Sequence, residues 1–383
     1  MNAMNGNIRV GNLFGIPFYI NPSWFLVLGL VTLTYGEELA AEFPQFGTVI
    51  PWSLGFVAAL LLFASVLAHE LGHSFVAIRQ GIDVKSITLF LFGGLASLGK
   101  ESETPAGAFW VAIAGPIVSL ALFGLFTAVE ITLPVSGPLA AIMGLLATIN
   151  LILAVFNLIP GLPLDGGNVL KSLVWKITGS PYRGIVIASR VGQFIGWLAI
   201  TLGAFSILGI SKFGSFWTLL IGVFLLLNAG RSAQSATVQE KLDGLTAKDA
   251  VTPDSPIVSA DMTLREFANE YVIGKGNWRK FLVTDEEGRL MGSLTVDDMK
   301  TIPTSEWTEA HVRDLTKQGE SSNAVKSNLS LLEVVMKLEK QDEKQLPVVG
   351  ENGKLVGLLE KTSIMRLLEQ EQNKSNEQQV NPA

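Results

Sequence analysis

The feature that most constrains the fold is a series of long apolar stretches in the first 230 or so residues. A helix needs about 20 apolar residues to cross a bilayer. Six stretches reach roughly that length: 17–36, 52–78, 106–130, 138–160, 184–209 and 214–230. Charged residues are scarce up to about Asn228 and frequent beyond it. The sequence therefore predicts a polytopic α-helical membrane protein of about six transmembrane helices, followed by a soluble half.

The connections between these stretches predict how the chain crosses the membrane. Basic residues gather in the connections on one side: Arg9, Arg79, Lys85, Lys100, Lys171, Lys176, Arg183, Arg231 and Lys241. The connection 37–51 on the other side is acidic. Because basic connections stay in the cytoplasm, we expect a multi-pass protein of the cell membrane with both termini cytoplasmic. The N-terminus is barely charged and lacks a clear cleavage site, so we interpret the first stretch as a retained span.

The second apolar stretch contains the motif His69-Glu70-Leu71-Gly72-His73. In a helix, His69 and His73 share one face, and Glu70 lies beside them. This is the arrangement of zinc hydrolases, in which two neutral imidazoles hold the metal and the carboxylate serves as the base. A chance match, or two core histidines satisfied by neighbours, is the structural alternative. Polar groups in a lipid-length helix are costly without a partner, which favours a bound metal.

Composition narrows the chemistry. The chain has no cysteine and only three histidines, of which His311 lies in the soluble half. A thiol nucleophile and a cysteine-ligated zinc site are excluded, so a metal must be held by histidine and carboxylate. Two other protease mechanisms are also excluded. A serine–histidine dyad needs a histidine on another span, but both histidines of the apolar half lie in one stretch. An aspartyl dyad needs two buried aspartates, but Asp165 stands alone. The net charge of -6 argues against nucleic acid as a partner.

The fourth stretch ends in a segment rich in proline and glycine, 157–167, which begins with Asn157 and contains Asp165. Such a break at membrane depth is tolerated only where the backbone faces protein or a wet cavity. Asp165 could simply cap the segment that follows, 168–177. Beside a histidine pair that lacks a third ligand we prefer Asp165 as that ligand, because a catalytic zinc takes three protein ligands and keeps one position open.

Residues 83–98 separate the second and third stretches. Their β-branched and aromatic content, with Gly93 and Gly94 in the middle, predicts a β-hairpin. An open strand edge there would offer hydrogen bonds to an extended substrate, with Phe92, Gly93 and Gly94 as the candidate substrate strand. The alternative is a plain structural hairpin.

Taken together, these motifs resemble the site-2 protease family of intramembrane zinc metalloproteases. The resemblance rests on the His69–His73 motif, on Asn157 and Asp165 in the break, and on Ala114-Gly115-Pro116 in the third stretch. It implies one zinc ion held by His69, His73 and Asp165, Glu70 as the base, and Asn157 as a residue that binds substrate backbone or the oxyanion. It also implies regulated intramembrane proteolysis of single-span proteins. No PDZ-like insertion is visible between the spans, so the chain resembles the compact six-span branch of the family.

The soluble half contains an internal repeat: 285–292 recurs as 350–357. Each copy is predicted as helix, strand, turn, strand and helix, which is similar to a tandem pair of cystathionine-β-synthase (CBS) domains. The resemblance implies ATP or another adenosine nucleotide as a regulator, with Thr295 and Asp298 at the ribose. The second copy has Glu360 and Ser363 there, so nucleotide binding is expected mainly in the first. The alternative is a pair that only dimerises or docks.

The predicted organisation is as follows: 1–230 membrane metalloprotease domain, 231–245 linker, 246–303 first CBS domain, 309–369 second CBS domain, and 370–383 disordered tail. The expected partners are a single-span transmembrane substrate, membrane lipid and a second copy bound through the CBS domains. A transporter or channel gated by the CBS pair and a catalytically dead scaffold are the competing functions. The substrate, and whether the CBS pair activates or inhibits, are not determined by the sequence.

Overall fold

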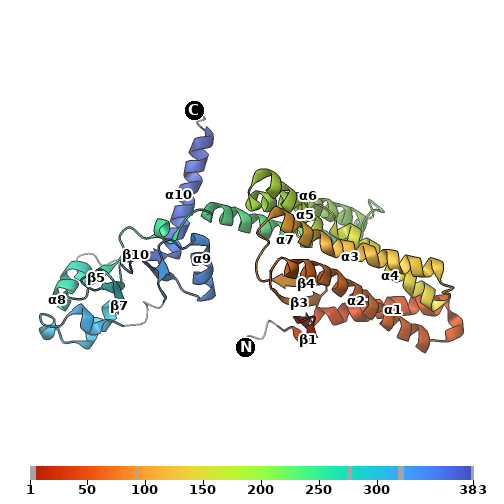
Figure 1. The fold of residues 1–383 in the computed structure, drawn as a ribbon, viewed down its shortest axis with the longest axis horizontal. Helices are drawn as coiled ribbons and strands as arrows, with labels where there is room; N and C mark the ends of the chain where they lie inside the picture. Colours follow the sequence, from red (N-terminus) through yellow and green to blue (C-terminus); the bar gives the residue numbers. More distant parts are fainter. Residues whose placement is uncertain (1–5, 92, 274–277, 318–322, 381–383) are drawn as a thin grey trace. The chain divides into compact units, whose positions relative to one another are not determined.

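The computed structural model describes residues 6–91, 93–273, 278–317 and 323–380. The chain divides into two compact units, Met1–Thr237 and Val238–Ala383. Figure 1 shows the first as a set of long helices beside a small sheet, and the second as short strands and helices. Each unit is described separately below.

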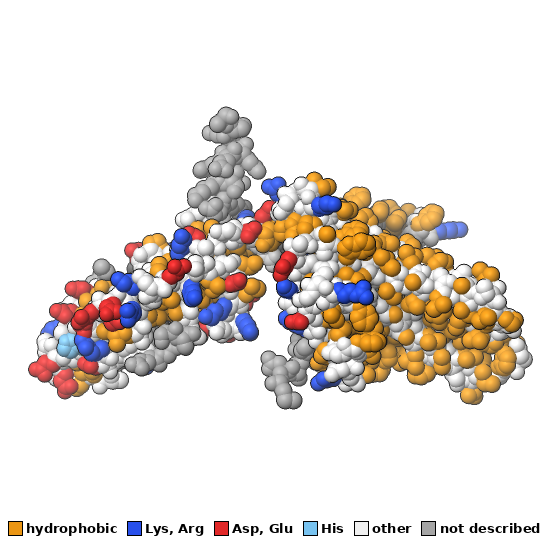
Figure 2. All heavy atoms as spheres, in the orientation of Figure 1, with side chains coloured by type: hydrophobic (Ala, Val, Ile, Leu, Met, Phe, Trp, Pro, Cys, Tyr) orange, Lys and Arg blue, Asp and Glu red, His pale blue; other side chains and the backbone are white. Residues whose placement is uncertain are grey.

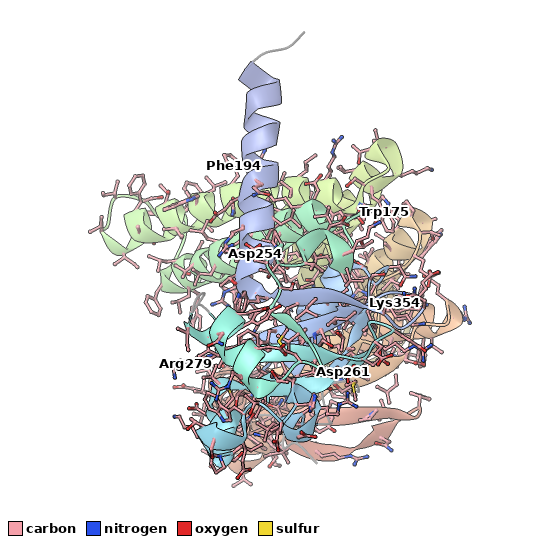
Figure 3. All side chains as sticks on the ribbon, turned by 90° about the vertical axis from the view of Figure 1, so that its left-hand side faces the viewer. Trp175, Phe194, Asp254, Asp261, Arg279 and Lys354 are labelled. Atoms are coloured by element: carbon pink, nitrogen blue, oxygen red, sulfur yellow. The ribbon has the colours of Figure 1, made fainter. Side chains whose placement is uncertain are left out.

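In the first unit, six helices among the residues that the structure describes are long and apolar enough to cross a membrane, which confirms the predicted fold class. They are α1 (Ser23–Glu42), α2 (Val49–Arg79), α3 (Pro105–Thr132), α4 (Pro138–Asn157), α6 (Pro181–Ile207) and α7 (Phe216–Leu242). A shorter helix, α5 (Asp165–Thr178), lies between α4 and α6 in the chain, and a 3-10 turn, η1 (Pro44–Phe46), lies between α1 and α2. Hydrophobic side chains cover this unit's surface in Figure 2. Phe194 on α6, labelled in Figure 3, is 70% exposed, as expected of a side chain that faces lipid.

Local sequence explains where several helices begin. Pro105, Pro138 and Pro181 each occupy the first turn of their helix, where a missing N–H costs nothing. Thr104 and Ser180 precede two of these prolines, and each hydroxyl accepts a hydrogen bond from the first turn. The chain therefore signals the start of α3 and α6 within a few residues.

A four-stranded sheet accompanies the helices. Its strands are β1 (Ile8–Leu13), β2 (Ile16–Ile20), β3 (Val84–Phe90) and β4 (Gly93–Leu98), in the spatial order β1-β2-β3-β4. β3 and β4 form the antiparallel hairpin predicted at 83–98, and β4 lies at the edge of the sheet. Phe92 lies outside the described residues.

The first apolar stretch was predicted to span from residue 17, and this boundary is wrong. Residues 16–20 form β2, which pairs in parallel with β3, and α1 begins only at Ser23. A short apolar run fits a strand as well as a helix, so its distant partner β3 decides. Asn21 donates its backbone N–H to the Leu89 carbonyl at 2.8 Å, which extends the pairing to the start of the helix.

In the described part of the second unit, two three-stranded sheets, one for each copy of the repeat, confirm the α/β pair of CBS domains. The first consists of β5 (Ile257–Ser259), β6 (Lys280–Thr284) and β7 (Leu290–Thr295), and the second of β8 (Val325–Lys326), β9 (Gln345–Val349) and β10 (Leu355–Glu360). The helices are α8 (Leu264–Phe267) continued by the π-helical η3 (Ala268–Ile273), α9 (Leu331–Lys340) and α10 (Lys361–Val380). Short 3-10 turns complete the unit: η2 (Ala247–Ala250), η4 (Val296–Thr301), η5 (Thr304–Glu306) and η6 (Val312–Leu315).

The cores of the two copies do not follow their order in the sequence. Ala247 and Ala250, at the start of the predicted first CBS domain (246–303), are buried in the core of the second, together with Leu331 and Leu359. Val312, at the start of the predicted second domain (309–369), is buried in the core of the first. The copies also meet through their turns, where the Leu355 N–H donates to the Gly288 carbonyl at 2.8 Å, next to Lys354 (labelled in Figure 3). The pair is therefore one interlocked body.

Two predicted boundaries differ from the structure. Most of the predicted linker, 231–245, belongs to α7, which continues to Leu242. The tail predicted to be disordered from Gln370 is the continuation of α10 as far as Val380, and 381–383 lie outside the described residues. The tail is rich in Gln and Glu, which favour helix without needing burial.

Candidate metal centre

Three predicted ligands converge between α2 and α5. His69 Nε2 lies 3.0 Å from Asp165 Oδ2, and His73 Nε2 lies 3.3 Å from the same oxygen. One ligand atom from each residue lies within 4.8 Å of the others. The two histidines are one helical turn apart on α2, whereas Asp165 is 96 positions from His69 in the chain. A donor set of two imidazoles and one carboxylate fits a catalytic zinc site.

The break after α4 explains how Asp165 reaches the histidines. α5 begins at Asp165 itself, and its N-cap, Leu164, makes no side-chain capping bond. Gly166 and Gly167 pack so tightly that an added Cβ would lie 2.3 Å from the Leu158 carbonyl oxygen and 2.3 Å from the Gly161 carbonyl carbon. The capping alternative is therefore not what the structure shows, because Asp165 bonds the histidines across the bundle.

The other ring nitrogen of each histidine has its own partner. His69 Nδ1 lies 2.9 Å from the Ser119 hydroxyl, and His73 Nδ1 lies 2.7 Å from the Val111 carbonyl oxygen. Since a carbonyl only accepts, His73 donates its Nδ1–H to Val111, and the Nε2 atoms of both histidines face Asp165. Hydrogen-bond partners of this kind orient metal-binding histidines, so the contacts of the two Nδ1 atoms also fit a zinc site.

Glycine at position 115 makes room for the imidazoles. A Cβ at Gly115 would lie 2.2 Å from His73 Nε2 and 2.6 Å from His69 Nε2. The sequence identified Gly115 only as part of a resemblance, and it missed Ser119 and Val111. A lone serine in an apolar helix is a weak signal, and a backbone carbonyl gives none.

Glu70 lies beneath the edge strand of the sheet. A Cβ at Gly94 on β4 would lie 2.3 Å from Glu70 Cγ. Glu70, the three candidate ligands and the backbone of Gly93 and Gly94 line one cavity of about 370 Å³. The carboxylate, the ligand cluster and an open strand edge thus share a single space.

Asn157 also lines this cavity, at the end of α4. Its side-chain N–H donates to the Leu153 carbonyl within the same helix, at 3.0 Å. The structure therefore brings Asn157 to the site predicted for it, with its amide nitrogen engaged by its own helix.

The candidate nucleotide residues of the soluble unit contact each other. The Thr295 N–H and hydroxyl both donate to Asp298 Oδ2, at 2.9 and 2.6 Å, and Lys317 Nζ donates to Oδ1 at 2.6 Å. Burial raises the pKa of the Asp298 carboxyl, but the bonds from Lys317 and Thr295 lower it more, so the pKa lies below its usual range. In the second copy, Ser363 accepts from the Glu360 N–H at 3.1 Å.

Comparison with known proteins identifies both parts of the chain. The model of Peptidase family M50 matches residues 57–143 and 123–199, and that of the CBS domain matches 247–303 and 320–370. The protein named "Putative zinc metalloprotease sll0528" of Synechocystis sp. is 60% identical over 96% of this chain and 96% of its own length. Zinc metalloprotease MJ0392 of Methanocaldococcus jannaschii is 28% identical over 95% and 97%.

Among solved structures, the site-2 protease from Methanocaldococcus jannaschii aligns with a TM-score of 0.43 and 28% identity, covering 59% of this chain and 95% of that one. The predicted enzyme class, membrane helices and CBS pair agree with the family matches and the relatives' names. Zinc is the metal that this family implies. The chain therefore belongs to peptidase family M50, the site-2 protease family of zinc metalloproteases, as a multi-pass membrane protein with tandem CBS domains.

Proposed function

We propose that this protein is an intramembrane endopeptidase that cleaves the transmembrane segment of single-span substrates in regulated intramembrane proteolysis. The observation that carries the proposal is the meeting of His69, His73 and Asp165 beside Glu70, under the open edge of β4, within a bundle of apolar helices. The basic residues in the connections support a cytoplasmic location of both termini.

His69, His73 and Asp165 would hold one zinc ion, which when bound polarises the scissile carbonyl and makes water a stronger nucleophile. Glu70 accepts a proton from the attacking water and delivers it to the leaving amine. Ser119 and the Val111 carbonyl keep the two imidazoles oriented during this transfer.

The edge strand β4 supplies hydrogen-bond partners for the backbone of a transmembrane substrate that has unwound locally. A helix satisfies its own peptide groups, so a locally unwound segment needs new hydrogen-bond partners in the bilayer. Gly93 and Gly94 offer backbone groups over Glu70 without side chains that would obstruct the approach. Asn157, released from the Leu153 carbonyl, donates to the substrate backbone or the oxyanion.

The CBS pair would regulate this activity by binding an adenosine nucleotide in the first copy. A ribose that bonds Asp298 competes with Thr295 and Lys317, which occupy both carboxylate oxygens in the structure. The same pair would join two copies of the chain. The support for both statements is the match to the CBS family and the arrangement of these residues.

The test is cleavage of a single-span model substrate by purified full-length protein in detergent. The samples are wild type, Glu70→Gln, a chelated sample restored with zinc, and Glu103→Gln as a control for an exposed glutamate. We expect Glu70→Gln to keep its zinc and lose cleavage by about 10²- to 10⁴-fold, the usual contribution of a general base. Each sample is assayed with and without ATP.

Full cleavage by Glu70→Gln would reject Glu70 as the base, whereas no cleavage in any sample, with zinc bound, would favour a transporter or channel. A rate that does not respond to ATP in wild type, with no ATP bound, would reject nucleotide regulation alone.

A further inference from the structure

Lys171 is a buried cation that the proposed mechanism does not use. The residue is 8% exposed, and its Nζ lies 2.5 Å from Glu101 Oε2. Glu101 belongs to the segment between β4 and α3, and its side chain is 75% exposed. Both residues line the cavity that contains Glu70 and Asp165.

A buried ammonium group is costly unless an anion is close to it. The partner that the structure gives Lys171 is a carboxylate on a connecting segment whose own side chain is 75% exposed. The segment does not need this ion pair as an anchor, because Ser102 donates to the Gln80 side chain at 3.2 Å and Gln80 donates to the Gly107 carbonyl at 3.1 Å. The burial of Lys171 therefore calls for another explanation.

The position of Lys171 relative to the metal centre supplies one. Asp165, Asn168 and Lys171 follow each other at intervals of three residues on α5, and all three line the cavity. Six helical residues rise about 9 Å. Along the sheet, Gly94 lies over Glu70, and the four residues to Leu98, the last of β4, span about 13 Å. An extended substrate strand laid beside β4 covers a distance of about 9 to 13 Å in about three to four residues.

We propose that Lys171 determines specificity by binding an acidic side chain of the substrate, three to four residues from the scissile bond, and that Glu101 occupies this position in the absence of substrate. The substrate carboxylate replaces Glu101, which turns towards solvent. The inference rests on the proposed function and adds a substrate class. These substrates are single-span segments with an aspartate or glutamate three to four residues from the scissile bond, in the part of the substrate that lies towards residues 99–104 of the protease.

The first test measures binding rather than turnover, in full-length Glu70→Gln protein in detergent. The probes are fluorescent single-span peptides with aspartate or asparagine placed one to six residues on either side of the cleavage site, and the readout is Kd from anisotropy. We expect about tenfold tighter binding of the aspartate peptide at three or four residues on one side, the size of a charge-assisted hydrogen bond.

Two substitutions separate the roles of the pair. Lys171→Met should bring the aspartate-to-asparagine ratio to about one, and Lys171→Arg should keep it. Glu101→Gln should tighten binding of the aspartate peptide further, because the competing carboxylate is gone. Lys176→Gln, an exposed lysine on the same helix, and Glu103→Gln should leave the ratio unchanged.

The inference is overturned if wild-type Lys171 gives no preference at any position, or if Lys171→Met retains one. Should Lys171→Met fail to fold, the Lys171→Arg and Glu101→Gln results still decide. Cleavage of the asparagine peptide by protein with Glu70 intact is measured in parallel. If that cleavage is absent the proposed function fails, whereas cleavage without an aspartate preference removes this inference alone.

Discussion

The two units of the chain use an aspartate at the start of a helix in opposite ways. Asp298 lies in the first turn of η4, where the Thr295 N–H and hydroxyl engage one oxygen and Lys317 engages the other. Asp165 begins α5 without a side-chain cap and contacts His69 and His73 from another helix. One carboxylate closes its own turn, and the other is left free to act across the bundle.

The residues around each aspartate account for this difference. A threonine three residues before Asp298 completes a reciprocal capping box. Before Asp165 stand Leu162, Pro163 and Leu164, which offer no side-chain donor, and after it the two glycines allow close packing against the break. An aspartate whose carboxylate makes no hydrogen bonds within its own turn is a candidate metal ligand. Substitutions at the two aspartates and at their neighbours test this difference.

The largest effect is expected from Asp165→Asn. The substitution removes the carboxylate that faces both Nε2 atoms, so zinc content and cleavage should fall together by at least about a hundredfold, more than is typical of residues that only orient a ligand. Zinc per chain is measured by mass spectrometry after dialysis, beside cleavage. Asp298→Asn is the matched control and should keep its zinc; stoichiometric zinc in Asp165→Asn would end the distinction between the two aspartates.

Gly115→Ala should have the next largest effect. The new Cβ would collide with both imidazoles, at 2.2 and 2.6 Å from their Nε2 atoms, and must push the ligands apart. We expect zinc affinity to fall by about a hundredfold, the upper end of the range for disturbed ligand orientation. Gly124→Ala is the control on the same helix, since its Cβ would meet nothing within 4 Å. Equal zinc affinity in the two variants would mean that α3 does not constrain the histidines.

Ser119→Ala should weaken zinc binding by about tenfold, because the His69 ring loses the hydroxyl that orients it. Competition with a fluorescent zinc chelator gives the affinity. Ser53→Ala on α2 is the control, since that hydroxyl bonds only the Val49 carbonyl of its own helix. A variant with unchanged affinity would show that the histidine pair is held by Asp165 and Val111 alone.

The comparison also shows what the sequence could and could not predict. Local sequence patterns and composition predict the His69–His73 motif, the membrane spans and the β-hairpin. Asp165 was identified by a missing third ligand, although its direction depends on how Gly166 and Gly167 pack, which no local pattern contains. Lys171 was read only as a basic residue of a connection, because its partner Glu101 is 70 positions away.

Long-range pairing explains the remaining errors. The apolar residues of β2 suit a helix or a strand, so local sequence predicts them as part of the first span, whereas the pairing with β3 makes them a strand. The exchange of segments between the CBS copies is also invisible locally: Val312 falls within the predicted second domain, 309–369, yet it is buried in the core of the first. Thr295 and Asp298 were read for a ligand, and their spacing is also that of a capping box.

The smallest effect is expected from Asp298→Asn, which tests whether the Asp298 carboxylate stabilises its own turn. Because hydrogen bonds hold the pKa of the folded Asp298 below its usual range, its stabilising contribution is present above the unfolded pKa of about 3.9 and is lost as pH falls through the folded value. At pH 7 the variant should lose about 1 kcal/mol locally. Hydrogen exchange of 290–301 should then be about fivefold faster than in wild type.

The exchange ratio of variant to wild type should stay constant from pH 7 to pH 5 and then approach one as the solution becomes acidic enough to protonate the folded carboxyl. Asp297→Asn is the matched neighbour, since Asp297 is exposed and pairs only with the exposed Lys300; its ratio should stay near one throughout. If Asp298→Asn behaves like Asp297→Asn at pH 7, the carboxylate does not stabilise its own turn. Asp298 would then be as free for a ligand as Asp165 is for a metal, and the contrast between the two units would disappear.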